Sequence, residues 1–164
     1  MRKLLVDLEV VLDVVLDRRP HAAAATGLWA ATEERRVTTL IPAHRLTTAF
    51  YLLERRHGSA TAWKTIRLIL QVFGVAGVDA AVLHRAASLQ MIDFEDAVMV
   101  AAAEAAGCEA VVTRDLAGFS GSSLPAIAPD VALALLADEA RAPGPLTRRR
   151  QRQPSQPPTD PPEA

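Results

Sequence analysis

Residues 93–115 read DFEDAVMVAAAEAAGCEAVVTRD, and this stretch decides the fold of the chain. It opens on an aspartate that suits a helix N-terminus, continues through small apolar residues and stops at Gly107, which is the pattern of a buried helix. The AVVT stretch at residues 110–113 then predicts a short strand. A helix followed so closely by an apolar strand is typical of α/β domains with a parallel sheet.

The same alternation continues on both sides of this stretch. Strands are expected over residues 3–7, 37–41, 73–78, 110–113 and 126–127, and helices over residues 10–16, 22–34, 46–56, 60–72, 79–89, 93–106 and 129–139. The strands are apolar throughout, which is typical of a sheet that is buried on both faces. Right-handed crossovers then predict an α/β fold with a mostly parallel central sheet and helices on both of its faces.

The end of the chain has a different composition. Residues 141–164 hold seven of the eleven prolines and a basic run, RRRQR, but no apolar periodicity. Such a segment cannot bury enough apolar surface to offset the entropy lost on ordering. We therefore expect one folded domain over residues 1–140 and a disordered Pro/Arg-rich tail over residues 141–164.

Charge and cysteine content exclude several classes of protein. The net charge is −1 and the tail carries five arginines and two acids, so residues 1–140 carry −4, which disfavours a simple DNA-binding module with a basic surface. The single cysteine, Cys108, excludes a disulfide framework and a zinc site of several thiolates. No apolar run reaches the length of a membrane span, and Asp7 and Glu9 interrupt the apolar N-terminus, so a cytoplasmic protein without membrane attachment is expected.

Three carboxylates stand where elements of the predicted sheet should meet. Asp7 ends the first strand, Asp115 follows the strand at residues 110–113, and Asp96 lies in the first turn of the helix before that strand. In open parallel sheets, ligand sites lie beyond the carboxyl ends of the strands. A cluster of like charges is tolerated when a hard divalent cation neutralises it, and Mg²⁺ or Mn²⁺ prefers oxygen ligands. Such a centre can activate water for phosphodiester cleavage.

Each of these residues also has a structural interpretation. Asp7 could accept hydrogen bonds from backbone amides, and Asp115 could be an ordinary turn residue. Asp93 suits the cap of the helix and Asp96 its first turn, where the helix dipole favours an acid. Thr113 could hold a phosphate or orient Asp115, or it could be a plain strand threonine.

Four segments together resemble a PIN domain. They are VDLEVVLDVVLDRRPH at residues 6–21, IPAHRLTTAFYLLERR at residues 41–56, DFEDAVMVAAAEAAGCEAVVTRDLAGF at residues 93–119, and SLPAIAPDVAL at residues 123–133. The resemblance covers roughly residues 3–137, and the spacing of DFEDAV and VVTRD is its most specific part. It implies a three-layer α/β/α fold and a magnesium-dependent ribonuclease with Asp7, Asp96 and Asp115 as catalytic and metal-binding residues. Many small members of this family are VapC-type toxins of bacterial toxin–antitoxin pairs.

The resemblance also implies partners, namely an RNA substrate, an antitoxin protein and a second copy of the chain. Family members pair through the region that here holds the apolar residues 50–53, although these residues could instead lie in the core. The basic run at residues 147–152 could contact RNA phosphates or an acidic partner, or be solvated. Glu95 is expected to face solvent, and the four histidines, which share no metal-ligand spacing, are expected at surfaces or helix ends.

Two positions depart from the family pattern. Glu9 stands where the family usually has Asn, and it shares one helix face with Asp13 and Asp17, so it could join the site or belong to a solvated stripe. Thr48 lies in the stretch where many members carry a Glu, and Glu54 is too far along the helix to replace it. Two hypotheses follow: a metal-dependent endoribonuclease acting as the toxin of a pair, and a catalytically weakened PIN-fold module that binds RNA or a protein partner.

Overall fold

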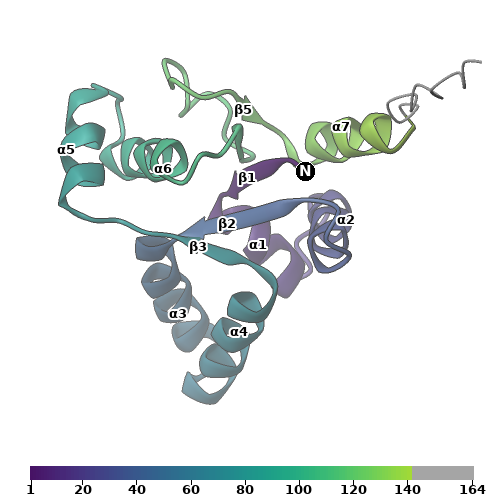
Figure 1. Ribbon diagram of the computed structural model, residues 1–164. Helices are drawn as coiled ribbons and strands as arrows, with labels where there is room; N and C mark the ends of the chain where they lie inside the picture. The colour runs from purple at the N-terminus through teal and green to yellow at the C-terminus, as the bar shows by residue number, and fades with distance from the viewer. Residues whose placement is uncertain (142–164) are drawn as a thin grey trace, which may run out of the picture.

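Figure 1 shows the computed structural model, which describes residues 1–141. In these residues an all-parallel sheet runs in the order β3-β2-β1-β4-β5. Its strands are β1 (Lys3–Val6), β2 (Thr38–Pro42), β3 (Gly74–Ala76), β4 (Ala110–Val112) and β5 (Ala126–Ile127). The helices are α1 (Leu8–Val15), α2 (Ala22–Glu33), α3 (Ala43–His57), α4 (Ser59–Val72), α5 (Ala80–Ser88), α6 (Phe94–Ala105) and α7 (Pro129–Arg141). The predicted α/β fold class is confirmed.

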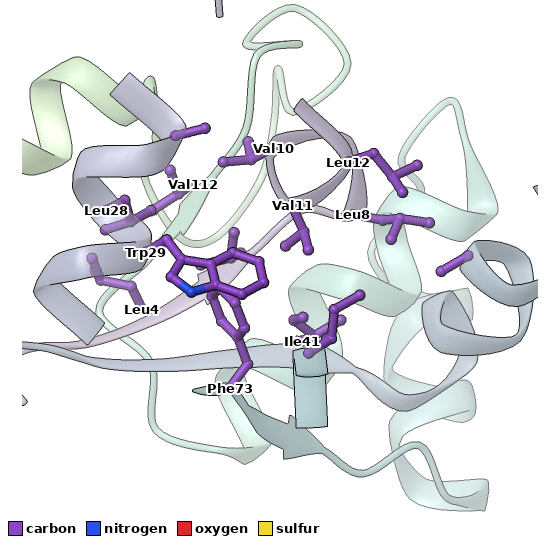
Figure 2. Packing of buried hydrophobic residues seen from close by; sticks show 14 of the residues in the cluster. Leu4, Leu8, Val10, Val11, Leu12, Leu28, Trp29, Ile41, Phe73 and Val112 are labelled. Atoms are coloured by element: carbon purple, nitrogen blue, oxygen red, sulfur yellow. The ribbon is translucent and has the colours of Figure 1, made fainter. Parts of the chain in front are cut away.

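Successive strand residues point to opposite faces of the sheet and build two cores. Leu4 and Val6 join a cluster with α1, α2, α3 and α4, whereas Leu5 joins a second cluster with α5 and α6. The helices of these two sets lie on opposite sides of the sheet, so the domain has the three layers α/β/α (Figure 1). Figure 2 shows the first cluster, where the ring of Trp29 meets Phe73 edge-on with centroids 5.0 Å apart.

The order in which strands are added to the sheet reverses beside β1. The chain passes from β1 to β2 on one side and later returns to β4 on the other, which makes the β1–β4 boundary a topological switch point. Val6 pairs with Val112 in the parallel register, and the Asp7 amide donates a hydrogen bond to the Val112 carbonyl at 2.9 Å. The register therefore brings Asp7 and Thr113 level with each other at the carboxyl ends of these strands.

Helix boundaries differ from the prediction at the start of α3 and at the end of α7. α3 begins at Ala43, three residues earlier than expected, and it starts as soon as Pro42 ends β2. α7 extends to Arg141, the first residue of the predicted tail, and residues 142–164 lie outside the described residues. Among the described helices none is long and apolar enough to cross a membrane.

The apolar residues 50–53 are divided between core and surface. Leu53 is buried in the first cluster, whereas Tyr51 and Leu52 are exposed. Phe50 packs against the exposed Trp63 of α4, with ring centroids 4.9 Å apart. The core interpretation thus holds for Leu53, whereas the surface on α3 and α4 retains exposed apolar side chains, and pairing through it stays a prediction.

Candidate active site

Asp7 is buried and links three elements at the switch point. Its carboxylate caps α1, where Oδ1 accepts a long hydrogen bond from the Glu9 amide at 3.5 Å. Oδ2 accepts a hydrogen bond from the Thr113 hydroxyl at 2.9 Å, and this threonine is fully buried. The Arg45 guanidinium lies 3.2 Å from Oδ1. Asp7 therefore accepts a backbone hydrogen bond, as its structural interpretation predicts. It also lies at the edge of the sheet where the site is expected.

Thr113 connects Asp7 to Asp115. Its hydroxyl donates to Asp7 and accepts a hydrogen bond from the Asp115 amide at 3.1 Å. Asp115 in turn accepts a hydrogen bond from the Gly118 amide at 3.0 Å, as a turn residue does. Thr113 is thus more than an ordinary strand threonine, because its one hydroxyl positions both carboxylate-bearing residues.

Asp96 and Asp115 approach each other over Gly118. A Cβ atom at Gly118 would lie 2.7 Å from Oδ2 of Asp115 and 3.1 Å from Oδ2 of Asp96. Both carboxylate oxygens are therefore close to one point, and the missing side chain of glycine leaves the space between them open.

The first turn of α6 concentrates negative charge. Asp93 caps this helix and accepts hydrogen bonds from the amides of Glu95 at 2.7 Å and Asp96 at 3.2 Å. The pKa of Asp96 is raised to about 6, first by burial and then by Asp93, with smaller contributions from Asp7 and Asp115, while Arg45 opposes the rise. We call Asp7, Asp96 and Asp115 the acidic centre. Besides burial, three neighbouring acids raise this pKa and only one guanidinium lowers it, so acids outnumber cations around Asp96.

Arg45 is a residue of the site that the sequence interpretation missed. Its guanidinium bridges Asp7 at 3.2 Å and Glu95 at 2.7 Å, and only 13% of its side chain is exposed. Glu95, expected to face solvent, is 45% exposed but holds this ion pair. A predicted start of α3 at Ala43 would have placed Arg45 in the first turn, directly after β2. Because β1 and β2 are parallel neighbours, their carboxyl ends lie side by side, and Arg45 would then have been expected near Asp7.

Glu9 takes part in a different group of charges. Its Oε2 lies 2.5 Å from Arg18 and 3.3 Å from Arg114. Arg114 also lies 3.2 Å from Asp13, which is fully buried, so the expectation that Asp13 lies on a solvated stripe is wrong. Burial raises the pKa of Asp13, and Arg114 is the strongest of the groups that oppose this rise. We call Glu9, Asp13, Arg18 and Arg114 the paired cluster.

Two further residues of the site region lie on α3. Thr48 is half-buried and lies one turn after Arg45, so the start of this helix carries a guanidinium and a hydroxyl. His44 belongs to the first turn, as expected for a histidine at a helix end, but both of its ring nitrogens are buried and have no hydrogen-bond partner among the described residues. Burial, with Arg45 beside it, lowers the pKa of His44 and favours the neutral imidazole.

The donor set fits a hard divalent cation by its chemistry. Asp7, Asp96 and Asp115 supply carboxylate oxygens, which Mg²⁺ and Mn²⁺ prefer, and acids outnumber guanidiniums around Asp96. As the side chains stand in residues 1–141, no three His, Cys, Asp or Glu residues are grouped so that they could hold a metal ion. A metal position shared by the three aspartates therefore stays a prediction.

Comparison with known proteins adds a family and a set of related folds. The family model of the PIN domain matches residues 3–117. No curated protein sequence matches the chain. The DNA-bound VapBC of Salmonella typhimurium is 14% identical, covers 79% of this chain and 99% of its own, and gives a TM-score of 0.62.

Two more solved structures have the same fold. VapBC2 of Rickettsia felis, bound to a promoter DNA fragment, is 12% identical with a TM-score of 0.60, covering 76% of this chain and 96% of that one. VapC20 of Mycobacterium tuberculosis, described as a toxin that cleaves the sarcin–ricin loop, is 21% identical with a TM-score of 0.54, covering 66% and 86%. At these identities the likeness shows the fold alone.

Proposed function

This chain belongs to the PIN domain family, and from that premise we propose that it is a divalent-metal-dependent endoribonuclease, the toxin of a toxin–antitoxin pair. The observation that carries the proposal is the linkage of Asp7 to Asp115 through the buried hydroxyl of Thr113 at the switch point. Asp96 meets Asp115 over Gly118 at the same edge. These contacts support a shared site for three acids from distant parts of the sequence, at the edge where parallel sheets bind their ligands.

Each residue of this centre has a distinct task in the proposal. Asp7, Asp96 and Asp115 would hold Mg²⁺ or Mn²⁺, which when bound supplies Lewis-acid polarisation and charge neutralisation for phosphodiester cleavage. Thr113 holds the carboxylate of Asp7 and the backbone of Asp115 in fixed positions. Gly118 keeps the approach to Asp96 and Asp115 free of a side chain.

The proposed partners are RNA, an antitoxin protein and a second copy of the chain. The similar VapBC structures support an antitoxin as a partner of this chain. The surface on α3 and α4, with Phe50, Tyr51, Leu52 and Trp63, is the proposed face for pairing of two copies, because single apolar residues are common at surfaces but a contiguous group marks an interface.

Cleavage of a mixed RNA pool tests the enzymatic proposal. The wild type is expected to cleave with Mn²⁺ or Mg²⁺ and to stop when EDTA is added. Asp96→Asn keeps the shape of the side chain and removes the charge that the cation needs, so cleavage and Mn²⁺-induced stabilisation should be lost together. Asp138→Asn on the exposed part of α7 is the matched control and should behave as the wild type does. Survival of both properties in Asp96→Asn would contradict the assignment of Asp96.

One observation favours the second hypothesis, a module that binds RNA or a protein without cleaving. Arg45 already pairs with Asp7, the acid nearest the middle of the sheet, and Thr48 adds no carboxylate. If the wild type neither cleaves RNA nor gains stability from Mn²⁺, the binding module is preferred. Retention of labelled RNA on the protein in EDTA then measures its activity.

A further inference from the structure

Arg45 lies at a place that its own helix disfavours. It belongs to the first turn of α3, which contains no acidic residue and whose cap, Pro42, provides no side-chain hydrogen bond. The positive end of the helix dipole lies at this terminus, so a cation there is destabilised by the helix. Contacts with other elements must therefore account for the buried position of this guanidinium.

Those contacts are carboxylates from two other elements. One terminal nitrogen of Arg45 lies 3.2 Å from Asp7, at the cap of α1, and the other lies 2.7 Å from Glu95, in the first turn of α6. The Nε atom is buried and has no hydrogen-bond partner among the described residues. Each terminal nitrogen of the planar guanidinium thus contacts a different acid, so Arg45 bridges α1 and α6 through its rigid fork.

We propose that Arg45 is an internal counter-cation of the acidic centre, which pairs with Asp7 and thereby lowers the affinity of the centre for a divalent cation. The inference rests on the proposed function, since it concerns the same carboxylates. A cation bound at Asp7 either displaces the guanidinium or lies beside it, and both cost free energy because the two charges are alike. Arg45 also lets Asp7 stay buried without metal, since a buried carboxylate needs a partner.

Binding of Mn²⁺ alone to the full chain, measured by isothermal titration calorimetry, tests this role. Arg45→Gln is expected to bind Mn²⁺ at least tenfold more tightly than the wild type, and its melting temperature should rise more on addition of Mn²⁺. Arg56→Gln makes the same change of charge at the exposed far end of the same helix, and its affinity should equal that of the wild type.

A third variant keeps the test valid if Arg45→Gln does not fold without metal. Arg45→Lys retains the positive charge but lacks the planar fork, so it cannot bridge Asp7 and Glu95 in the same way. Its Mn²⁺ affinity should lie between those of the wild type and Arg45→Gln, and Arg45→Gln should refold when Mn²⁺ is added.

The outcomes separate this inference from the proposed function. Equal Mn²⁺ affinities of the wild type, Arg45→Gln and Arg45→Lys, or weaker binding by the two variants, would overturn the counter-cation role and leave a metal-binding centre in place. Absence of Mn²⁺ binding by the wild type and by every variant would overturn the metal-dependent function together with the role of Arg45.

Discussion

The acidic centre and the paired cluster adjoin each other at the loop Thr113–Asp115, yet they are balanced in opposite ways. The paired cluster holds two carboxylates and two guanidiniums within salt-bridge distance. In the acidic centre, only Asp7 of the three aspartates pairs with a guanidinium in the described residues, that of Arg45, which also pairs with Glu95. One group is neutral, whereas the other keeps an excess of negative charge.

This difference separates two uses of buried charge. Asp13 in the paired cluster is fully buried, and a buried ion pair contributes little net stability because desolvation offsets its attraction. Its effect is positional, since it fixes Arg114, the residue between Thr113 and Asp115. The acidic centre cannot balance itself, and its excess charge leaves it available to a cation. Neutral pairs thus hold the loop on which the unbalanced acids are presented.

The largest expected effect comes from breaking the paired cluster. Arg114→Met leaves the carboxylate of Asp13 buried without its closest partner and should lower the free energy of unfolding by roughly 3 kcal/mol, the lower end for a broken buried pair, because Arg114 is partly exposed. A thermal melt should show a fall of the order of 10 °C for a domain of this size.

Two controls show whether the loss comes from the unpaired charge. Arg19→Met removes an arginine whose side chain is 85% exposed and should change the melting temperature by about 1 °C at most. The double variant Arg114→Met with Asp13→Leu removes the stranded charge and should recover most of the stability. A double variant as unstable as Arg114→Met would show that the cluster acts through packing instead.

A smaller effect is expected from the hydroxyl that joins the two acids. Thr113→Val keeps the shape of the side chain but removes the hydrogen bonds to Asp7 and Asp115, which should cost about 1–2 kcal/mol. Mn²⁺ affinity should fall as well, because the carboxylate of Asp7 and the backbone of Asp115 each lose one of the contacts that position them.

Thr39→Val is a closely matched control for this substitution. Thr39 is buried in β2, which is separated from β4 by β1, and its hydroxyl donates to Thr32 at 3.0 Å, away from the acidic centre. It should lose a comparable amount of stability and leave Mn²⁺ binding unchanged. If both variants bind Mn²⁺ as the wild type does, Thr113 has only a structural role.

The same comparison shows what the sequence could predict. The placement of Asp7 and Asp115 followed from apolar strands that end in acids, because the ends of parallel strands meet at one edge. The burial of Asp13 could not be predicted, because its periodicity with Glu9 and Asp17 is that of a solvated stripe and its partner Arg114 is distant in sequence. A pattern along one helix carries no information about which charge another element brings to it.

Arg45 was missed for a related reason. The sequence pattern placed the start of its helix at Leu46, so Arg45 fell in an expected loop without a defined direction. The start at Ala43 brings Arg45 into the first turn, beside the end of β1. Pro42 at the end of β2 suits the position before a helix, but proline there is also compatible with a turn, and only the packed sheet distinguishes the two.

The smallest expected effect is a dependence of stability on pH that comes from Asp96 in the acidic centre. The pKa of Asp96 is about 6 in the folded protein, raised first by burial and then by Asp93, against 3.8 for an ordinary aspartate. The folded state therefore binds this proton more tightly than the unfolded state does. The resulting stability is fully present below about pH 4 and is lost as pH rises through 6.

Asp96→Asn removes this dependence, because asparagine does not ionise. In EDTA, its melting temperature relative to the wild type should rise by a few degrees between pH 4 and pH 7 and stay constant above pH 7. Asp138→Asn on α7 should show no such rise. The raised pKa of Asp13 affects both proteins equally and cancels in the difference. A relative melting temperature that stays flat across this range would mean that the charge of Asp96 is compensated after all, and the contrast between the two clusters would then be lost.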